Sequence, residues 1–305
     1  MNALSFPPAA NCLKSVAIGV SSLERSVEFY TQIWGLTEIH RDNRIAYLRA
    51  AGCDHHVLAL HEQARPGLVS ITFGADSPTQ VDLLHASLRD NGVAVDRSPA
   101  PLNSAGGGYG FSFRDPEQRC IQIIADRAVH PQRLDDADRP VRLAHVVLNS
   151  ADADAATGFM LDRLGFRLSD STAMMQFVRC NSSHHSIAFA KTGNGTLNHI
   201  AFEMASWNAL MHGAGRLKEA GHAVQWGVGR HGPGDNVFAY FVDPDGLAIE
   251  YTAEVQQIDE ADHRPGTPEE WKRPANRMDQ WGYADLPTER LKAAMHGDHQ
   301  LKALL

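Results

Sequence analysis

Two histidines and one glutamate stand among apolar residues, where such side chains are costly to bury. His145 lies within LAHVVL, His199 within LNHIAF and Glu250 within AIEY. Burying a charged carboxylate or an unpaired imidazole in such surroundings costs free energy unless a partner compensates. One divalent metal bound to all three would compensate at once, and two histidines with one carboxylate leave coordination positions open and suit Fe(II). The three residues are therefore predicted metal ligands.

An internal repeat of the sequence supports the prediction that these three residues are metal ligands. Three pairs of segments match at a shift of about 129 residues: 54–60 with 184–190, 77–95 with 206–224, and 110–126 with 238–254. We expect two copies of one unit, at about 12–127 and 141–255. At the three ligand positions the first copy carries Ala17, Ser70 and Gln122. Each ligand candidate alone could be a hydrogen-bonded core residue, but their occurrence as a set in one copy favours a metal site there.

Each copy is predicted to contain a strand, a helix and three strands, twice over. The first helices are expected at 23–35 and 153–165. Ser77 can cap the second helix of the first copy, and Gly92 marks its end. The predicted fold class is therefore α+β: two tandem copies of a paired βαβββ module, each a curved mixed sheet around a cavity with helices outside. Such a cavity is the usual place for a small-molecule site.

The repeat also predicts the domain organisation. We expect an N-terminal domain without metal ligands at 1–136, a catalytic metal-binding domain at 137–255 and a C-terminal strap at 256–305. Trp271 and Trp281 of the strap should dock on the body of the protein, because tryptophan buries a large apolar surface. The strap is expected either to pack on the outer helices or to cover the mouth of the second cavity and exclude water.

Charge and composition exclude several classes of protein. Lys and Arg number 28 and Asp and Glu 36, so the net charge is −8, which repels nucleic-acid phosphates. No apolar run approaches the ~20 residues that a membrane span needs. The 4 cysteines are widely spaced without a CxxC pair, which indicates free thiols in a reducing compartment. We therefore expect a cytoplasmic protein that binds neither nucleic acid nor membrane.

Further proton-carrying side chains gather in the second copy. His184 and His185 precede a predicted strand, His231 lies in a glycine-rich loop, and Tyr240 stands 10 residues before Glu250. If an Asp-Pro turn folds the last two strands back on each other, Tyr240 shares a face with Glu250. A metal centre needs such neighbours for proton transfer and ligand orientation. Taken singly they also fit a loop residue and a sheet aromatic, and the first copy repeats the His-His pair without the ligands.

Two segments of the second copy resemble the signature of the type I extradiol catechol dioxygenases, in the vicinal oxygen chelate superfamily. They are GRH at 229–231 and YFVDPDGLAIE at 240–250. The resemblance extends over 12–255, including a first copy that lacks the metal site. Ala239 departs from the family pattern, in which a larger aliphatic residue is usual, and this difference should affect packing and not chemistry.

The resemblance implies a role for each candidate residue. The implied Fe(II) ligands, with Mn(II) as the alternative metal, are His145, His199 and Glu250. The implied catalytic residues are His185, His231 and Tyr240. His185 is implied as the acid–base residue in preference to His184, and the other two as hydrogen-bond donors. The candidates to line the substrate pocket are Val147, which shares a strand face with His145, and Phe177 and Ala188.

The implied activity is ring cleavage, in which both atoms of O2 are inserted into a catechol-type aromatic diol. The implied partners are a small-molecule catechol, O2 and further copies of the chain in a homo-oligomer. The apolar pocket candidates indicate a substituted or fused-ring catechol.

Three alternatives stay open at this point. One is another metal-dependent enzyme of the same superfamily, of the glyoxalase or antibiotic-modifying type, and a second is a keto-acid dioxygenase. The third is a non-enzymatic protein that binds an aromatic compound or a drug, because one fold serves many functions. A binding protein, however, would not need three metal ligands together with three proton-handling groups.

Overall fold

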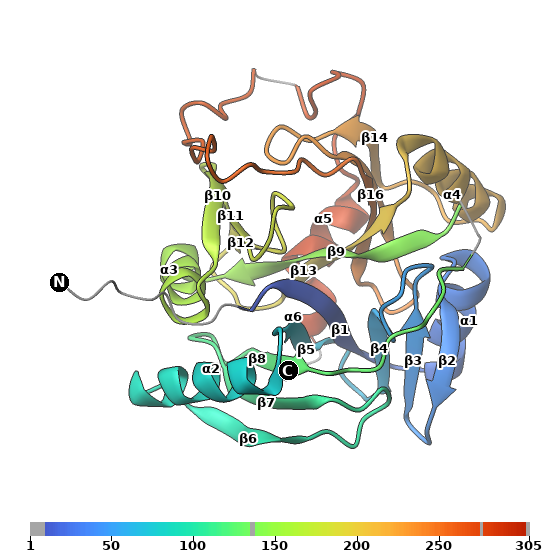
Figure 1. Ribbon diagram of the computed structural model, residues 1–305. Helices are drawn as coiled ribbons and strands as arrows, with labels where there is room; N and C mark the ends of the chain where they lie inside the picture. Colours follow the sequence, from blue (N-terminus) through green and yellow to red (C-terminus); the bar gives the residue numbers. More distant parts are fainter. Residues whose placement is uncertain (1–9, 135–137, 275–276, 303–305) are drawn as a thin grey trace.

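Two eight-stranded mixed sheets form the body of the protein in the computed structural model, which describes residues 10–134, 138–274 and 277–302. The first sheet has the order β2-β3-β4-β1-β5-β8-β7-β6 and the second β10-β11-β12-β9-β13-β16-β15-β14. Figure 1 shows the N-terminal module in blue and cyan below the C-terminal module in green to orange. The helices lie mostly on the outside of the sheets, as predicted.

The strands of the first sheet are β1 Cys12–Val20, β2 Thr37–Arg41, β3 Ile45–Arg49, β4 Leu58–Glu62, β5 Gly67–Gly74, β6 Val95–Pro101, β7 Tyr109–Arg114 and β8 Cys120–Ala125. Those of the second are β9 Pro140–Ser150, β10 Arg167–Ser171, β11 Met175–Arg179, β12 Ile187–Lys191, β13 Leu197–Met204, β14 Trp226–Arg230, β15 Val237–Val242 and β16 Ala248–Ala253. The helices are α1 Leu23–Glu28, α2 Pro78–Asp90, α3 Ala153–Leu164, α4 Trp207–Glu219, α5 Glu289–His296 and α6 Asp298–Lys302, with a π-helical segment, η1, at Phe29–Ile33.

Both sheets are built in the same way. In the first, β1 and β5 pair antiparallel at the centre, and each has a parallel neighbour on its other side, β4 and β8. In the second, β9 and β13 pair antiparallel and are flanked by the parallel strands β12 and β16. The order β-α-β-β-β therefore occurs twice in each module, which confirms the predicted fold class.

The second helix of each module begins and ends as its sequence predicts. The Ser77 hydroxyl accepts a hydrogen bond from the Gln80 amide at 3.3 Å, and Pro78 occupies the first turn. Gly92 follows the helix with φ +75°, a left-handed conformation that glycine adopts without strain. Ser206 caps α4 in the same way, through the Ala209 amide.

The first helix differs from the predicted 23–35. It is α-helical only to Glu28 and then widens into η1, where the Trp34 amide donates to the Phe29 carbonyl at 2.9 Å. The wider turn directs the Tyr30 and Trp34 side chains toward the second module: the Tyr30 hydroxyl donates to the Asp243 carboxylate at 3.0 Å. The sequence of the helix alone cannot predict this departure, because the contacts that favour it come from the other module.

Trp34 is the largest fully buried side chain at this contact between modules. Its ring stacks on Tyr251 with centroids 3.8 Å apart and meets Phe202 edge to face. We expect Trp34→Ala to lower the free energy of unfolding by about 3–5 kcal/mol, because a large cavity would remain. Urea titration measures this loss. Trp207→Ala is the matched control, since Trp207 is 52% exposed, and its effect should stay below about 1 kcal/mol. Equal losses in the two variants would contradict this account of the module contact.

The C-terminal segment runs over the second module as an extended strap and then turns helical. In Figure 1 the strap, in orange-red, passes over the top of the second module between the ends of β10 and β14. It ends in α5 and α6, two helices that the sequence pattern does not predict. Leu291 and Ala294 of α5 are buried in one apolar cluster with Tyr240 and Phe238. The strap is therefore tied to the sheet that carries the candidate ligands.

Within the described ranges, no helix combines the length and the apolar character that crossing a membrane requires.

Candidate metal centre

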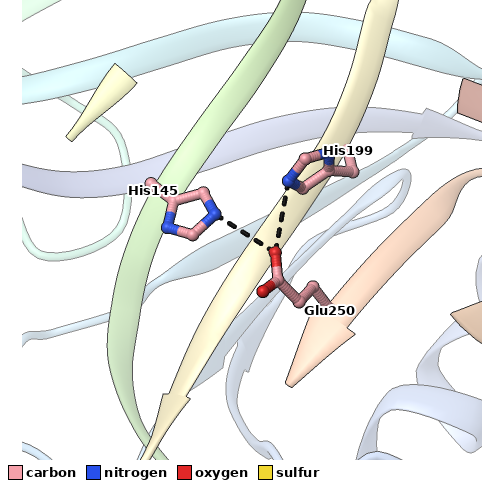
Figure 2. Close-up of side chains that lie close together, drawn as sticks. All are labelled: His145, His199 and Glu250. Atoms are coloured by element: carbon pink, nitrogen blue, oxygen red, sulfur yellow. Dashed lines mark hydrogen bonds and ion pairs between the residues drawn. The ribbon is translucent and has the colours of Figure 1, made fainter. Parts of the chain in front are cut away.

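The three predicted ligands lie together on three neighbouring strands of the second sheet. His145 projects from β9, His199 from β13 and Glu250 from β16 (Figure 2). Their ligand atoms all lie within 4.8 Å of one another, and all three residues are buried. The Nε2 atoms of His145 and His199 each lie 3.2 Å from the same carboxylate oxygen, Oε2 of Glu250. Such a cluster has the residue types and the spacing that a divalent metal needs.

The hydrogen bonding of His199 favours a cation between these residues. Its Nδ1 lies 2.8 Å from Oδ1 of Asn198, an oxygen that can only accept, so Nδ1 carries the proton. In the neutral ring, Nε2 then presents a lone pair toward the Glu250 carboxylate, and Nε2 makes no hydrogen bond of its own. Lone pairs from an imidazole and a carboxylate repel one another at 3.2 Å unless a positive charge lies between them. His145 Nε2 can donate a hydrogen bond to the same Glu250 oxygen, but a neutral His199 cannot, so hydrogen bonds within the cluster leave His199 Nε2 without a partner and a metal ion would supply one.

The charge of the pocket supports the same conclusion. Burial alone would raise the pKa of Glu250, but positive charge beside it, at the positions of His145 and His199, outweighs burial and lowers the pKa, so the carboxylate is ionised when it has a cation as its neighbour. Burial lowers the pKa of His199, which keeps that ring neutral. Among the residues that the structure describes, no Lys or Arg lies within 4.0 Å of the Glu250 carboxylate. A buried negative charge without a cationic partner is costly, and a divalent metal would neutralise it.

The corresponding positions of the first module are satisfied without a metal. Gln122 Oε1 accepts a hydrogen bond from the Thr72 hydroxyl at 3.1 Å, and both residues belong to neighbouring strands, β8 and β5. Ala17 offers no ligand atom at all. Both modules have the same backbone arrangement, so the difference between them lies in these side chains.

His185 belongs to a chain of hydrogen bonds that fixes its tautomer. His184 Nε2 lies 2.7 Å from the Asp170 carboxylate and must donate to it, so the Nδ1 of His184 is an acceptor. The two Nδ1 atoms of His184 and His185 are 3.0 Å apart, so the proton between them belongs to His185. The Nε2 of His185 is therefore left unprotonated. Burial, reinforced by the neighbouring His145, lowers the pKa of His185 well below its usual value.

His231 and Tyr240 form a second polar pair beside the ligands. His231 Nε2 lies 3.1 Å from the Tyr240 hydroxyl, and the His231 ring stacks on Phe238 with centroids 4.0 Å apart. Tyr240 is the register partner of Glu250 between β15 and β16, which confirms that the two share a face. Burial and the Glu250 charge raise the pKa of Tyr240, and burial lowers the pKa of His231 to about 3. Near neutral pH the pair therefore consists of a protonated phenol and a neutral imidazole.

A cavity of about 710 Å³ opens from the ligands. Its lining includes five of the six predicted ligand and catalytic side chains, namely His145, His199, His185, His231 and Tyr240. Among the predicted substrate contacts, Val147 and Phe177 also line it. Ala188 does not: it is fully buried between them in the same apolar cluster, as the register partner of both. Most of the remaining wall is apolar, with Met175 and Trp226 among its members.

The strap supplies one side of this cavity. Pro268, Trp271 and Arg273 line it, and Met295 of α5 adds to the wall. The strap is also joined to the His185 chain, because the Gly266 amide donates to the second oxygen of Asp170 at 2.6 Å. The prediction that both strap tryptophans dock is only partly right: Trp281 remains 43% exposed, beside Trp207 and Arg230 on the outer surface.

Sequence reasoning missed the supporting residues of the site. Asp170 lies in a strand of mostly polar residues, RLSDS, and Asn198 stands beside His199, so neither is distinguished from its neighbours by a pattern or motif. Asp170 follows a β-bulge in β10, between Leu168 and Asp170. Bulges of this kind often redirect a side chain near a functional site. Trp271 was predicted to be buried, but no pattern in the strap shows which surface it contacts.

Because Trp271 lines the cavity, its side chain should contribute to substrate binding. We expect Trp271→Ala to raise the KM for an aromatic substrate about tenfold, because losing part of a buried aromatic contact costs about 1.5 kcal/mol. The catalytic residues do not change, so kcat should change much less. Steady-state kinetics measure both constants. Trp281→Ala is the matched control in the same strap, and its KM should stay within about twofold of the unmodified protein. Equal KM values for the two variants would show that the strap does not contact substrate.

Comparison with known proteins gives a consistent set of relatives. The model of the Glyoxalase/Bleomycin resistance protein/Dioxygenase superfamily matches residues 13–123 and 142–251. The chain is 34% identical over 166 residues to metapyrocatechase 2 of Cupriavidus necator, a match that covers 53% of this chain and 46% of that protein. It is 34% identical over 198 residues to 3-methylcatechol 2,3-dioxygenase of Pseudomonas putida, covering 59% of this chain and 68% of that one.

A solved structure is similar over nearly the whole chain. The Mn(II)-bound glyoxalase from Novosphingobium aromaticivorans superposes with a TM-score of 0.87 at 36% sequence identity, over 93% of this chain and 94% of that chain. The match to the first of the two sequence relatives spans only about half of that protein's length, 46%.

Proposed function

We propose that this chain, which belongs to the Glyoxalase/Bleomycin resistance protein/Dioxygenase superfamily, is an Fe(II)-dependent extradiol dioxygenase that cleaves the ring of a catechol-type diol. One observation carries the proposal: the buried cluster of His145, His199 and Glu250 opens into an apolar cavity that also contains three groups able to hold or move a proton. The relatives named for catechol substrates support the same class of reaction.

The three ligand residues determine the donor atoms and the open coordination positions of a bound metal. His145, His199 and Glu250 would hold it through two neutral nitrogens and one carboxylate oxygen, which leaves positions open for substrate. When bound, the metal lowers the pKa of a catechol hydroxyl and places the diol beside O2. Asn198 orients the His199 ring through its Nδ1–H, and such supporting contacts tune ligand basicity.

His185 is assigned to proton transfer. Its Nε2 is unprotonated and its ring lies with its centroid 4.1 Å from that of His145, so it can take a proton from a diol bound beside the ligands. It can return this proton later, when an oxygen leaves. The chain through His184 to Asp170 holds the tautomer that this role requires. Tyr240 keeps its proton and can donate a hydrogen bond to an oxyanion, while His231 positions the hydroxyl.

The cavity indicates the class of catechol. Its volume of about 710 Å³ falls in the range of sites for drug-sized ligands and leaves room beyond a single ring. The apolar wall that includes Val147, Phe177 and Met175 favours a catechol with an apolar substituent or a fused ring. We therefore propose such a diol as the substrate.

The test is anaerobic reconstitution with Fe(II), followed by a panel of catechols in the presence of O2. We expect O2 uptake in a 1:1 ratio with substrate and a yellow ring-opened product. Reconstitution with Mn(II) in parallel decides the metal, because one solved relative binds Mn(II). Higher turnover with Mn(II) would replace iron in the proposal, and absence of O2 uptake with both metals would refute ring cleavage.

A second candidate function is that of a glyoxalase. The observation that favours it is the 36% identity over nearly the whole chain to the Mn(II)-bound glyoxalase. A glyoxalase-type isomerisation consumes no O2, so an oxygen electrode separates the two candidates directly. The His185 and Tyr240 groups in one cavity with a complete ligand set favour the dioxygenase.

A further inference from the structure

The N-terminal module contains a cavity of its own, of about 360 Å³. It lies at the place where the second module holds the metal ligands, since Ala17, Ser70 and Gln122 all line it. Among the described residues, its lining includes Arg97, Arg114 and Arg127 but no Asp or Glu. A cavity lined by cationic side chains without carboxylates attracts anions.

Arg127 is the central cation of this cavity. Its Nη1 donates to the Ser15 hydroxyl at 2.9 Å and lies 3.4 Å from Nε2 of His56. Its Nε is buried without a partner, and its Nη2 makes no hydrogen bond within the described part of the chain. No carboxylate of the described residues lies within 4.0 Å of it: Asp54, which lines a neighbouring pocket together with Arg127 and attracts its charge from a longer distance, pairs with Lys14 at 3.0 Å. A guanidinium with donors left over and no counter-ion is costly to bury.

The other basic groups that line this cavity do not neutralise Arg127, and among the described residues no carboxylate lines it. His56 is buried, and burial followed by the Arg127 charge lowers its pKa to about 2, so the ring is neutral. Arg114 is bonded to Asp96 at 2.6 Å and brings no net charge. Arg97 is exposed at the rim, and within the described ranges its side chain makes no ion pair. Arg127 therefore gives this cavity a positive charge that no carboxylate in the described lining pairs.

Part of the cavity wall is apolar. Ala17, Tyr47 and Ala59 form a small cluster of nearly buried side chains, separate from the main core, and all three line the cavity. Ala17 replaces the histidine of the second module, which leaves space where a ligand imidazole would lie. A guanidinium with unused donors beside a small apolar cluster has the chemistry that recognises an aromatic carboxylate.

We propose that the N-terminal module binds a small aromatic carboxylate, with the carboxylate on Arg127 and the ring against Ala17, Tyr47 and Ala59. This site is separate from the metal centre and does not depend on the reaction assigned to it. It gives the module without metal ligands a binding role of its own.

Benzoate is the probe, and isothermal titration calorimetry is the measurement. We expect the full-length protein to bind benzoate, and Arg127→Gln to weaken binding about 10- to 100-fold, because charge-assisted hydrogen bonds are lost. Arg127→Lys should retain part of the affinity, since it keeps the charge but loses the planar fork. Arg89→Gln, an exposed arginine at the end of α2, is the matched control and should bind normally.

Two more measurements test the charge and the location of the site. Benzyl alcohol has the same ring without the charge and should bind far more weakly than benzoate. Glu250→Gln alters the metal site of the second module and should leave benzoate binding unchanged. Melting curves without benzoate show whether each variant folds, and benzoate should raise the melting temperature of the unmodified protein but not of Arg127→Gln. Equal binding by Arg127→Gln, loss of binding in Glu250→Gln, or absence of any benzoate-dependent heat would overturn the proposal.

Discussion

Glu250→Gln is expected to leave the protein without a retained metal and to reduce ring cleavage by about 10³-fold or more, because a metal supplies several kcal/mol of transition-state stabilisation. The amide has nearly the same shape but removes the one buried negative charge that the site offers a cation. His145→Ala and His199→Ala should have the same effect, since each removes one of the three ligand atoms. Metal analysis after reconstitution and gel filtration, together with O2 uptake, measures both losses.

The first module provides the matched control for this experiment. Gln122→Ala changes the residue equivalent to Glu250, and metal content should remain one ion per chain. Because Ala17 and Ser70 replace the two histidines there, we expect no second metal in the unmodified protein. Two metals per chain, or full occupancy in Glu250→Gln, would show that the ligand set is wrong.

His185→Phe is expected to retain the metal and to bind a catechol, yet to lose about 10²–10⁴-fold in kcat, the usual contribution of a positioned acid–base group. His184→Phe should cost less, because His184 acts only through its neighbour. Stopped-flow kinetics under single turnover separate the chemical step from binding. A larger loss in His184→Phe than in His185→Phe would reverse the assignment of the pair.

Asp170→Asn gives a sharper test of the hydrogen-bonded chain. The Gly266 amide already donates to one Asp170 oxygen, so the new amide would direct its NH2 group at His184. His184 would then carry its proton on Nδ1 and force the proton of His185 onto Nε2, the wrong tautomer for a base. We therefore expect kcat to fall with little change in metal content or KM. An unchanged kcat would show that Asp170 has only a structural role.

The sequence is sufficient to predict the fold and the clustering of His145, His199 and Glu250. The repeat fixed the order of strands and helices, and the three ligands stood out because each is polar within an apolar strand. His231 and Tyr240 stand out as polar residues of the second copy, the resemblance implies their roles, and the pairing of β15 with β16 places Tyr240 opposite Glu250. These features can be recognised from a short stretch of sequence, either as a polar residue within an apolar strand or as a short motif.

The missed features depend on contacts between distant segments. The π-helical turn at Phe29–Ile33 accompanies aromatic packing on the other module, and Asp170 meets His184 only through the fold of β10. The strap has no periodic pattern, so nothing in its sequence shows that Trp271 lines the cavity while Trp281 stays outside. Ala188 is expected at the pocket surface, but its short side chain lies between its larger register partners Phe177 and Val147, which line the cavity in its place.

The position of α5, near the end of the chain, has a consequence for the order in which the parts of the site form during synthesis. Met295 lines the cavity, and its carbonyl accepts a hydrogen bond from the Asn149 side chain at 2.7 Å, although the two residues lie 146 positions apart. During synthesis on the ribosome, all eight strands of the second sheet emerge before this helix does. The ligands can therefore meet while the cavity is still open on one side. A newly made chain should acquire the ability to bind metal before it can enclose a substrate.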